Sequence, residues 1–222
     1  SSSPVISLQD GTIYFGSEDK NIYAVDSDGN QKWKAELDEE IWSSPALDVA
    51  SNTLYVGTIN GIIYAVDSIN GNIKWSYNTQ DFIIGSPSID SENGLVVFGT
   101  GEGKVFALDE DDGTIEWVYP RSDNETIGAI SATPAINVDK NAVYVGDGDG
   151  TLYALNNATG ALKWAYSVGS GILSSPATDK DSVIYFGCED NNVYSIKDAD
   201  TSAVLKWSYP TGGEVYSSPA IS

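Results

Sequence analysis

Two acidic strings in the sequence have the residue types and spacing that could bind Ca²⁺. The string from Asp26 to Asn30 (DSDGN) matches the start of an EF-hand loop, and the string from Asp147 to Gly150 (DGDG) repeats the alternating carboxylates. An EF-hand loop also needs Gly at its sixth position and Glu at its twelfth. The first string has Gln31 and Leu37 at these places, and the second has Ala158 at the twelfth. Both strings are therefore interpreted as hairpin turns.

The residues that the sequence lacks exclude several kinds of catalytic site. It contains no His and a single Cys, Cys188. Without His there is no Ser–His–Asp triad, no Cys–His dyad and no imidazole metal site. One Cys allows neither an intramolecular disulfide nor a CxxC redox or zinc motif. These absences count against an enzyme that relies on such groups.

The charge balance limits the partners of the chain. Eleven basic residues stand against 32 acidic ones, which gives a formal net charge of −21. This excess argues against nucleic acid and against an anionic membrane surface, because both need clustered Lys and Arg. The longest apolar stretches, such as Ile62 to Val66, are far shorter than the ~18 residues of a membrane span, so no membrane insertion is expected. The charge either serves a function or solvates an acidic surface.

A tandem repeat organises the whole chain. Two small residues followed by Pro recur, and the spacings between successive Pro residues are 41, 42, 47, 42 and 43. The Pro residues are Pro4, Pro45, Pro87, Pro134, Pro176 and Pro219. An internal period of this length predicts a repeat architecture rather than ordinary globular domains.

Each repeat carries three further marks in the same order. The first is an apolar and aromatic run that ends in Gly, the second is Tyr-Ala-Val-Asp or a close variant, and the third is a Trp after Lys or Glu. Asn-Gly and Asp-Gly turns separate these short runs, which predicts antiparallel strands, and the Pro-led segment supplies a fourth. Four strands in ~42 residues is the period of a propeller blade. The repeated tryptophans are expected to pack between blades: Trp33, Trp75, Trp117, Trp164 and Trp207.

These residues resemble the PQQ-like (pyrrolo-quinoline quinone) repeat, whose tryptophan-docking motif reads A-x-D-x-x-T-G-x-x-x-W. The segments Ala65–Trp75, Ala107–Trp117 and Ala154–Trp164 keep that spacing. The first copy is one residue shorter, and the last is two longer and has lost the Ala, Asp and Gly. The resemblance covers the whole chain and implies a β-propeller.

We therefore predict an all-β fold, a β-propeller of four-stranded antiparallel PQQ-like blades with tryptophan-docking motifs. The chain holds five blades plus one strand, as a single domain or arc of a ring of seven or eight blades. The approximate repeats are 1–42, 43–84, 85–131, 132–173 and 174–216, with the start of a further blade at 217–222.

The resemblance implies two kinds of function. Quinoprotein alcohol dehydrogenases of this family hold the quinone and Ca²⁺ in the central funnel and often carry a vicinal Cys pair, which this sequence lacks. Related propellers, such as the lipoprotein of outer-membrane assembly, are not catalytic. The prediction is a non-catalytic scaffold or protein-interaction module with a protein or peptide partner and no catalytic, cofactor-binding or metal-binding residues. The alternative is a partial or degenerate dehydrogenase that uses PQQ and calcium. The family also implies an extracytoplasmic or cell-surface location.

Candidate contact residues lie in the most variable segments, which join each Trp strand to the next Pro strand. Propeller loops of this kind form the rim of the central channel, where a rigid scaffold can present binding residues. Trp42 and Tyr216 stand three residues before Pro, and Arg121, the only Arg, lies in the longest connection. They could anchor a peptide or an anionic small molecule. Alternatively, the aromatic pair caps the blade core and Arg121 pairs with Asp123 or Glu125.

Overall fold

The structure is a computed structural model that describes residues 2–122 and 125–221. Its described residues form five four-stranded antiparallel sheets and no helix. Within each sheet the strands follow one another in chain order. The sheets are β1 Val5–Ile6, β2 Ile13–Gly16, β3 Asn21–Val25 and β4 Gln31–Glu36; β5 Ala46–Asp48, β6 Thr53–Gly57, β7 Ile62–Asp67 and β8 Ile73–Asn78; β9 Ser88–Asp90, β10 Leu95–Gly99, β11 Val105–Asp109 and β12 Ile115–Tyr119; β13 Ala135–Asn137, β14 Ala142–Gly146, β15 Thr151–Asn156 and β16 Leu162–Ser167; and β17 Ala177–Thr178, β18 Val183–Gly187, β19 Asn192–Asp198 and β20 Ala203–Pro210.

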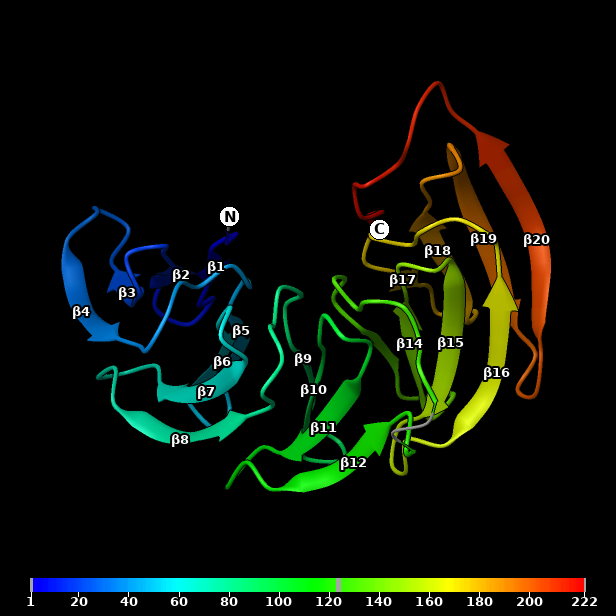
Figure 1. The fold of residues 1–222 in the computed structure, drawn as a ribbon. Helices are drawn as coiled ribbons and strands as arrows, with labels where there is room; N and C mark the ends of the chain where they lie inside the picture. Colours follow the sequence, from blue (N-terminus) through cyan, green and yellow to red (C-terminus); the bar gives the residue numbers. More distant parts are fainter. Residues whose placement is uncertain (1, 123–124, 222) are drawn as a thin grey trace.

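The five sheets stand around a common centre like the blades of a propeller (Figure 1). The short Pro-led strands β1, β5, β9, β13 and β17 lie on the inside, and the Trp-bearing strands β4, β8, β12, β16 and β20 lie on the outside. The circle is open between the first and the last sheet. The prediction of an all-β propeller with four-stranded antiparallel blades is confirmed.

The Ala and Trp of the docking motif are direct neighbours across strands. Ala65 pairs with Trp75 and Ala107 pairs with Trp117, and the register shifts by one residue immediately after each Ala. The same pairing and irregularity recur in all five sheets, with Ser195 in place of Ala in the fifth. A small residue in the third strand leaves room for the indole beside it, and the bulge increases the local twist of the blade.

The Ser-Pro segments connect the blades at the centre of the propeller. Ser43 Oγ donates to the Gly57 carbonyl at 2.9 Å and accepts the Gly57 N–H at 2.8 Å within its own blade. The serine directly before Pro accepts a backbone N–H from the preceding repeat, as Ser86 Oγ does from Ser44 at 2.8 Å. The same contact recurs from Ser3 to Ser44, from Thr133 to Ser175 and from Ser175 to Ser218. The repeated small residues thus link neighbouring inner strands.

Tryptophans fasten each outer strand to the following blade. Trp33 Nε1 donates to the Ser68 carbonyl at 3.0 Å, and Trp117 Nε1 donates to the Asn157 carbonyl at 2.7 Å. Trp75 Nε1 donates to the Glu110 carbonyl in the same way, whereas Trp164 Nε1 donates to the Asp198 carboxylate at 2.9 Å. Each of the four apolar clusters combines side chains of two neighbouring sheets. The core therefore lies between blades, as stacked repeats require.

The fifth repeated tryptophan packs against no further blade within the described residues. Trp207 is 44% exposed, whereas Trp117 and Trp164 are each 5% exposed. No described residue accepts a hydrogen bond from its indole, and it packs against Tyr185 of its own sheet. At the other end of the arc, the first-blade glycine Gly29 has no atom within 4 Å of a Cβ built on it, whereas its counterpart Gly160 lies against Trp117.

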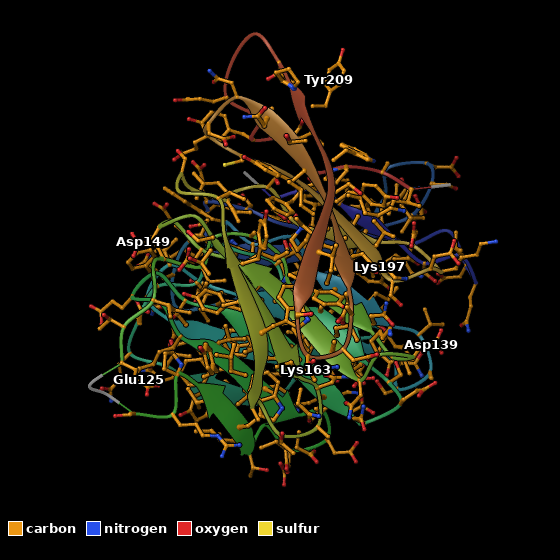
Figure 2. The ribbon with its side chains drawn as sticks, turned by 90° about the vertical axis from the view of Figure 1, so that its right-hand side faces the viewer. Glu125, Asp139, Asp149, Lys163, Lys197 and Tyr209 are labelled. Atoms are coloured by element: carbon orange, nitrogen blue, oxygen red, sulfur yellow. The ribbon has the colours of Figure 1, made fainter. Side chains whose placement is uncertain are left out.

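The loops fall on two opposite faces. One face holds the links between blades and the hairpins between second and third strands, and we call it the connection face. The links are residues 37–45, 78–87, 120–134, 168–176 and 211–219. The remaining turns form the turn face. Figure 2 shows Asp149 and Glu125 at the edge formed by the connection face and Asp139 at the opposite edge. The connections include the segments that carry Trp42, Arg121 and Tyr216.

Candidate functional site

Trp42 and Tyr216 occupy equivalent places in two connections and are both exposed. Trp42 is 39% exposed and Tyr216 is 53% exposed. Trp42 Nε1 donates to Glu40 Oε2 at 3.0 Å, and the Tyr216 hydroxyl donates to Glu214 Oε2. The Glu214 hydrogen bond raises the pKa of Tyr216 to about 12, so this hydroxyl remains a donor at neutral pH. A glutamate two residues earlier therefore orients each aromatic ring.

The residue before each aromatic one fills the blade core. Ile41 is 1% exposed, and a Cβ at Gly16 would lie 2.2 Å from its Cγ2. Val215 stands equally close to Gly187. The other connections have the same contact at Ile83 with Gly57, Ile130 with Gly99 and Ile172 with Gly146. Since the β-branched residue four places before Pro closes the core, Trp42 and Tyr216 are not needed for that task.

Arg121 lies apart from the two aromatic residues. It follows β12 and lines a cavity of about 290 Å³ with Leu162 of the outer strand β16. It also borders a second cavity of about 390 Å³ with Tyr77 and Asn78 of the outer strand β8. The sequence places Arg121 at the channel rim, but the structure places it among the outer strands, because β12 itself runs along the outside of its blade (Figure 1).

Within the part of the chain that the structure describes, Arg121 hydrogen-bonds a backbone carbonyl in the next blade. Its Nη2 donates to the Thr159 carbonyl at 2.6 Å, which ties the long third connection to the docking turn of the fourth blade. Glu125, one of the two acids considered as its partner, lines the same 290 Å³ cavity. The other, Asp123, lies outside the described residues. This contact gives Arg121 a role between blades.

Phe82 is an exposed aromatic residue on the connection face that the sequence comparison of repeats missed. It is 42% exposed, and its ring lies over Gly101, where a Cβ would come within 1.8 Å of Cζ. Phe82 stands five residues before Pro87, and Trp42 and Tyr216 stand three before theirs. A comparison of positions at equal distance from Pro therefore does not group Phe82 with Trp42 and Tyr216. Counting aromatic residues per connection would have found it.

The two acidic strings are turns between strands. Asp26 Oδ1 accepts the N–H groups of Asp28 at 3.0 Å and Asn30 at 2.8 Å. The Asp147 carboxylate accepts N–H groups from Gly128 and Thr151 at 2.9 and 2.7 Å. Their oxygens are thus engaged with the backbone that they shape. Within residues 2–122 and 125–221, no three or more His, Cys, Asp and Glu side chains gather in a way that could hold a metal ion.

Cys188 is a core residue in the hairpin that follows β18. Its side chain is fully buried, and its Sγ donates to the Ser170 carbonyl at 3.2 Å. Burial raises the pKa of the thiol to about 11, so it stays protonated and unreactive at neutral pH.

The sequence profile of the family described as outer membrane protein assembly factor BamB matches residues 1–140 and 130–221. The chain belongs to this family. The match spans all five sheets and agrees with the PQQ-like repeat predicted from the docking motif. No match was found among curated proteins.

Solved structures share the fold of this BamB-family chain at low sequence identity. BamB from Moraxella catarrhalis has a TM-score of 0.74 and 19% identity, with 92% of this chain and 60% of that chain covered. Quinohemoprotein alcohol dehydrogenase from Comamonas testosteroni has a TM-score of 0.77 and 19% identity, with 94% and 42% covered. A chain of the mitotic checkpoint complex has a TM-score of 0.83 and 16% identity, with 97% and 66% covered. The BamB-family chain therefore spans about 60% of the M. catarrhalis protein and less than half of the dehydrogenase.

The links between blades lie on the connection face, and the sheets themselves pack against one another. Among the described residues of this BamB-family chain, no helix has the length and apolar character to cross a membrane. The connection face is distinguished by three exposed aromatic residues, Trp42, Phe82 and Tyr216, which lie in connections that also carry acidic residues. The acidic residues of the described connections are Asp38, Glu39, Glu40, Asp81, Glu125 and Glu214.

Proposed function

We propose that the chain is a non-catalytic β-propeller scaffold that binds a protein or peptide partner through its connection face. The contact residues are Trp42 and Tyr216, joined by Phe82. The proposal rests on one observation above all: Trp42 and Tyr216 are exposed although Ile41 and Val215 already close the blade core. Large aromatic side chains held at the surface are the commonest anchors of protein interfaces.

The arrangement of these side chains favours binding over chemistry. Trp42 and Tyr216 are each hydrogen-bonded to a glutamate, which limits the rotamer entropy lost when a partner binds. The connections carry many more acidic than basic residues. Electrostatic complementarity therefore favours a partner segment that combines apolar anchors with Lys or Arg. Membership of the BamB family supports both a protein partner and an extracytoplasmic location.

The alternative is a partial or degenerate quinoprotein dehydrogenase, which is suggested by the similarity to the C. testosteroni enzyme. Quinone enzymes of this fold need Ca²⁺ ligands around a shared funnel. In this chain Asp26 and Asp147 bond backbone N–H groups of their own turns and of a neighbouring connection. These two carboxylates are thus engaged with backbone N–H groups, which supports the scaffold over a calcium and quinone site at either turn.

Removing the two aromatic residues is expected to weaken partner binding at least about tenfold, because each anchor contributes on the order of 1 kcal/mol or more. The immobilised 222-residue chain would be used to select from a displayed library of random short peptides. We expect selected peptides to be rich in Lys, Arg and aromatic residues. Their Kd for the double variant Trp42→Ala/Tyr216→Ala is then compared with that for the unchanged chain.

The matched control removes two exposed apolar residues from the turn face. Ile69 is 67% exposed and Ile73 is 48% exposed, so Ile69→Ala/Ile73→Ala deletes exposed apolar surface away from the connections. This variant should keep the original Kd. Equal binding by both double variants, or no enrichment of any peptide, would rule out the connection face as the binding surface.

A further inference from the structure

Two acidic residues, Asp48 and Glu110, stand on opposite sides of the interface between the second and third blades, at the positions that Asp90 and Asn157 occupy at the next interface. Asp48 is the last residue of β5 and is 8% exposed. Glu110 lies in the turn after β11, and its carbonyl accepts hydrogen bonds from Tyr55 Oη at 3.2 Å and Trp75 Nε1 at 3.0 Å. Its Oε2 is buried and has no hydrogen-bond partner among the described residues. A buried carboxyl oxygen without a donor is costly and calls for a physical reason.

The next interface shows what this position can do. Asn157 stands in the fourth blade where Glu110 stands in the third, and Asp90 ends β9 as Asp48 ends β5. Asn157 is fully buried, and its Nδ2 donates to Asp90 Oδ2 across the interface. An amide has N–H groups to give, whereas an ionised carboxylate can only accept. Glu110 can therefore make the equivalent bond only when it carries a proton.

The first interface shows the same pair of positions without charge. There Ser7 and Ser68 take the two places, and both line a small cavity of about 150 Å³ between the first and second blades. Short hydroxyl side chains leave this space open. The blades therefore pack with several kinds of side chain at these positions, and the two acids of the second interface are not needed for the fold.

The charged groups that act on the Glu110 carboxyl group are acidic. The charge of Asp48 acts on it from the second blade, and the charges of Asp90, Asp109 and Asp111 act on it from its own blade. The nearby cation Lys74 in β8 instead donates to the Ser51 carbonyl and to Thr53 Oγ1, at 2.9 and 2.7 Å. Burial, and then the charge of Asp48, raise the pKa of Glu110 above its ordinary value. Burial and the charges of Glu110 and Asp48 also raise the pKa of Tyr55, so its hydroxyl stays a donor.

We propose that Glu110 and Asp48 form a proton-operated latch between the second and third blades. When Glu110 takes up a proton from water, its carboxylic O–H donates to Asp48, as Asn157 donates to Asp90. When Glu110 loses that proton to water, two carboxylates face each other and weaken the contact between the blades. Acid therefore tightens this one interface.

The direction of the pH dependence follows from linkage. Because the folded pKa of Glu110 lies above its unfolded value, the folded state holds this proton more tightly. The resulting stabilisation is complete below the ordinary pKa of about 4.5 and is lost as the pH rises through the folded pKa. At neutral pH the interface is in its weaker state.

The variant Glu110→Gln tests the latch, because its amide donates to Asp48 at every pH. At pH 7 we expect its unfolding equilibrium constant, from urea denaturation of the full chain, to be at least about fivefold smaller than that of the unchanged chain. This difference should shrink as the pH falls to about 4.5. Glu116→Gln removes the same charge from an exposed place in β12 and should show no such pH-dependent difference.

A local readout separates the latch from a general effect of charge. The indole N–H of Trp75 bonds Glu110 at the second interface, and that of Trp117 bonds Asn157 at the third. At pH 7, Glu110→Gln should slow hydrogen exchange of the Trp75 indole and leave Trp117 unchanged. Equal slowing at both indoles, or a stability difference that is constant with pH, would overturn the latch.

Discussion

Replacing Trp117 by alanine should lower the free energy of unfolding by about 3–5 kcal/mol. The Trp117 side chain is 5% exposed and packs between the third and fourth blades. Its Nε1–H also satisfies the Asn157 carbonyl at 2.7 Å. The substitution thus creates a cavity, and it also leaves the buried Asn157 carbonyl without a hydrogen-bond donor. Urea denaturation followed by circular dichroism measures the loss.

The matched variant is Trp207→Ala, which removes the same side chain from the same position of the fifth blade. Trp207 is 44% exposed and has no acceptor among the described residues. We expect a loss below about 1.5 kcal/mol, since only part of the indole surface is buried. Equal losses for the two variants would mean that the tryptophans stabilise their own sheets and do not fasten neighbouring blades.

Replacing Gly160 by alanine should destabilise the same interface, from the side of the fourth blade, by about 2–5 kcal/mol. Gly160 has a φ of +65°, and a Cβ there would lie 2.5 Å from Trp117 Cε3. A methyl group adds the cost of left-handed backbone, about 1–2 kcal/mol, and pushes the indole out of its place, which costs about 1–3 kcal/mol. Thermal unfolding followed by circular dichroism gives the change.

Gly29→Ala isolates the backbone part of this effect. Gly29 has a φ of +84°, but no atom lies within 4 Å of its Cβ position. It should lose only about 1–2 kcal/mol. For a chain of this length each kcal/mol shifts Tm by about 2–4 °C, so the two variants are readily separated. Identical shifts in Tm would show that contact with Trp117 does not matter at Gly160.

Much of the fold could be predicted from the sequence because the blade is specified by short-range features repeated five times. Asn-Gly and Asp-Gly turns fix the hairpins, and Trp at one equivalent position needs a neighbouring blade to bury it. The repeat of β-branched residues ahead of Pro, which includes Ile41, was also visible in the sequence. Its role in closing the blade core depends on the contact between Ile41 and Gly16, which the sequence does not show.

The candidate site was less predictable because it depends on how far a side chain reaches and on its neighbours in space. Arg121 belongs to a connection, yet it extends outward to Thr159 of the next blade. Phe82 stands at a different offset from Pro than Trp42 and is exposed on the same face. The relation between Glu110 and Asp48 joins residues 62 positions apart in the sequence, and periodicity alone does not pair them.

Titration of the 222-residue chain with pyrrolo-quinoline quinone and Ca²⁺ separates a scaffold from a quinoprotein dehydrogenase most directly. A ligand at 100 times its Kd would stabilise the chain by about 2.7 kcal/mol, which corresponds to a rise in Tm of about 5–11 °C. We predict no saturable rise in Tm and no change in the quinone absorption spectrum. A saturable rise that needs both the quinone and Ca²⁺, with a matching spectral change, would contradict the non-catalytic scaffold.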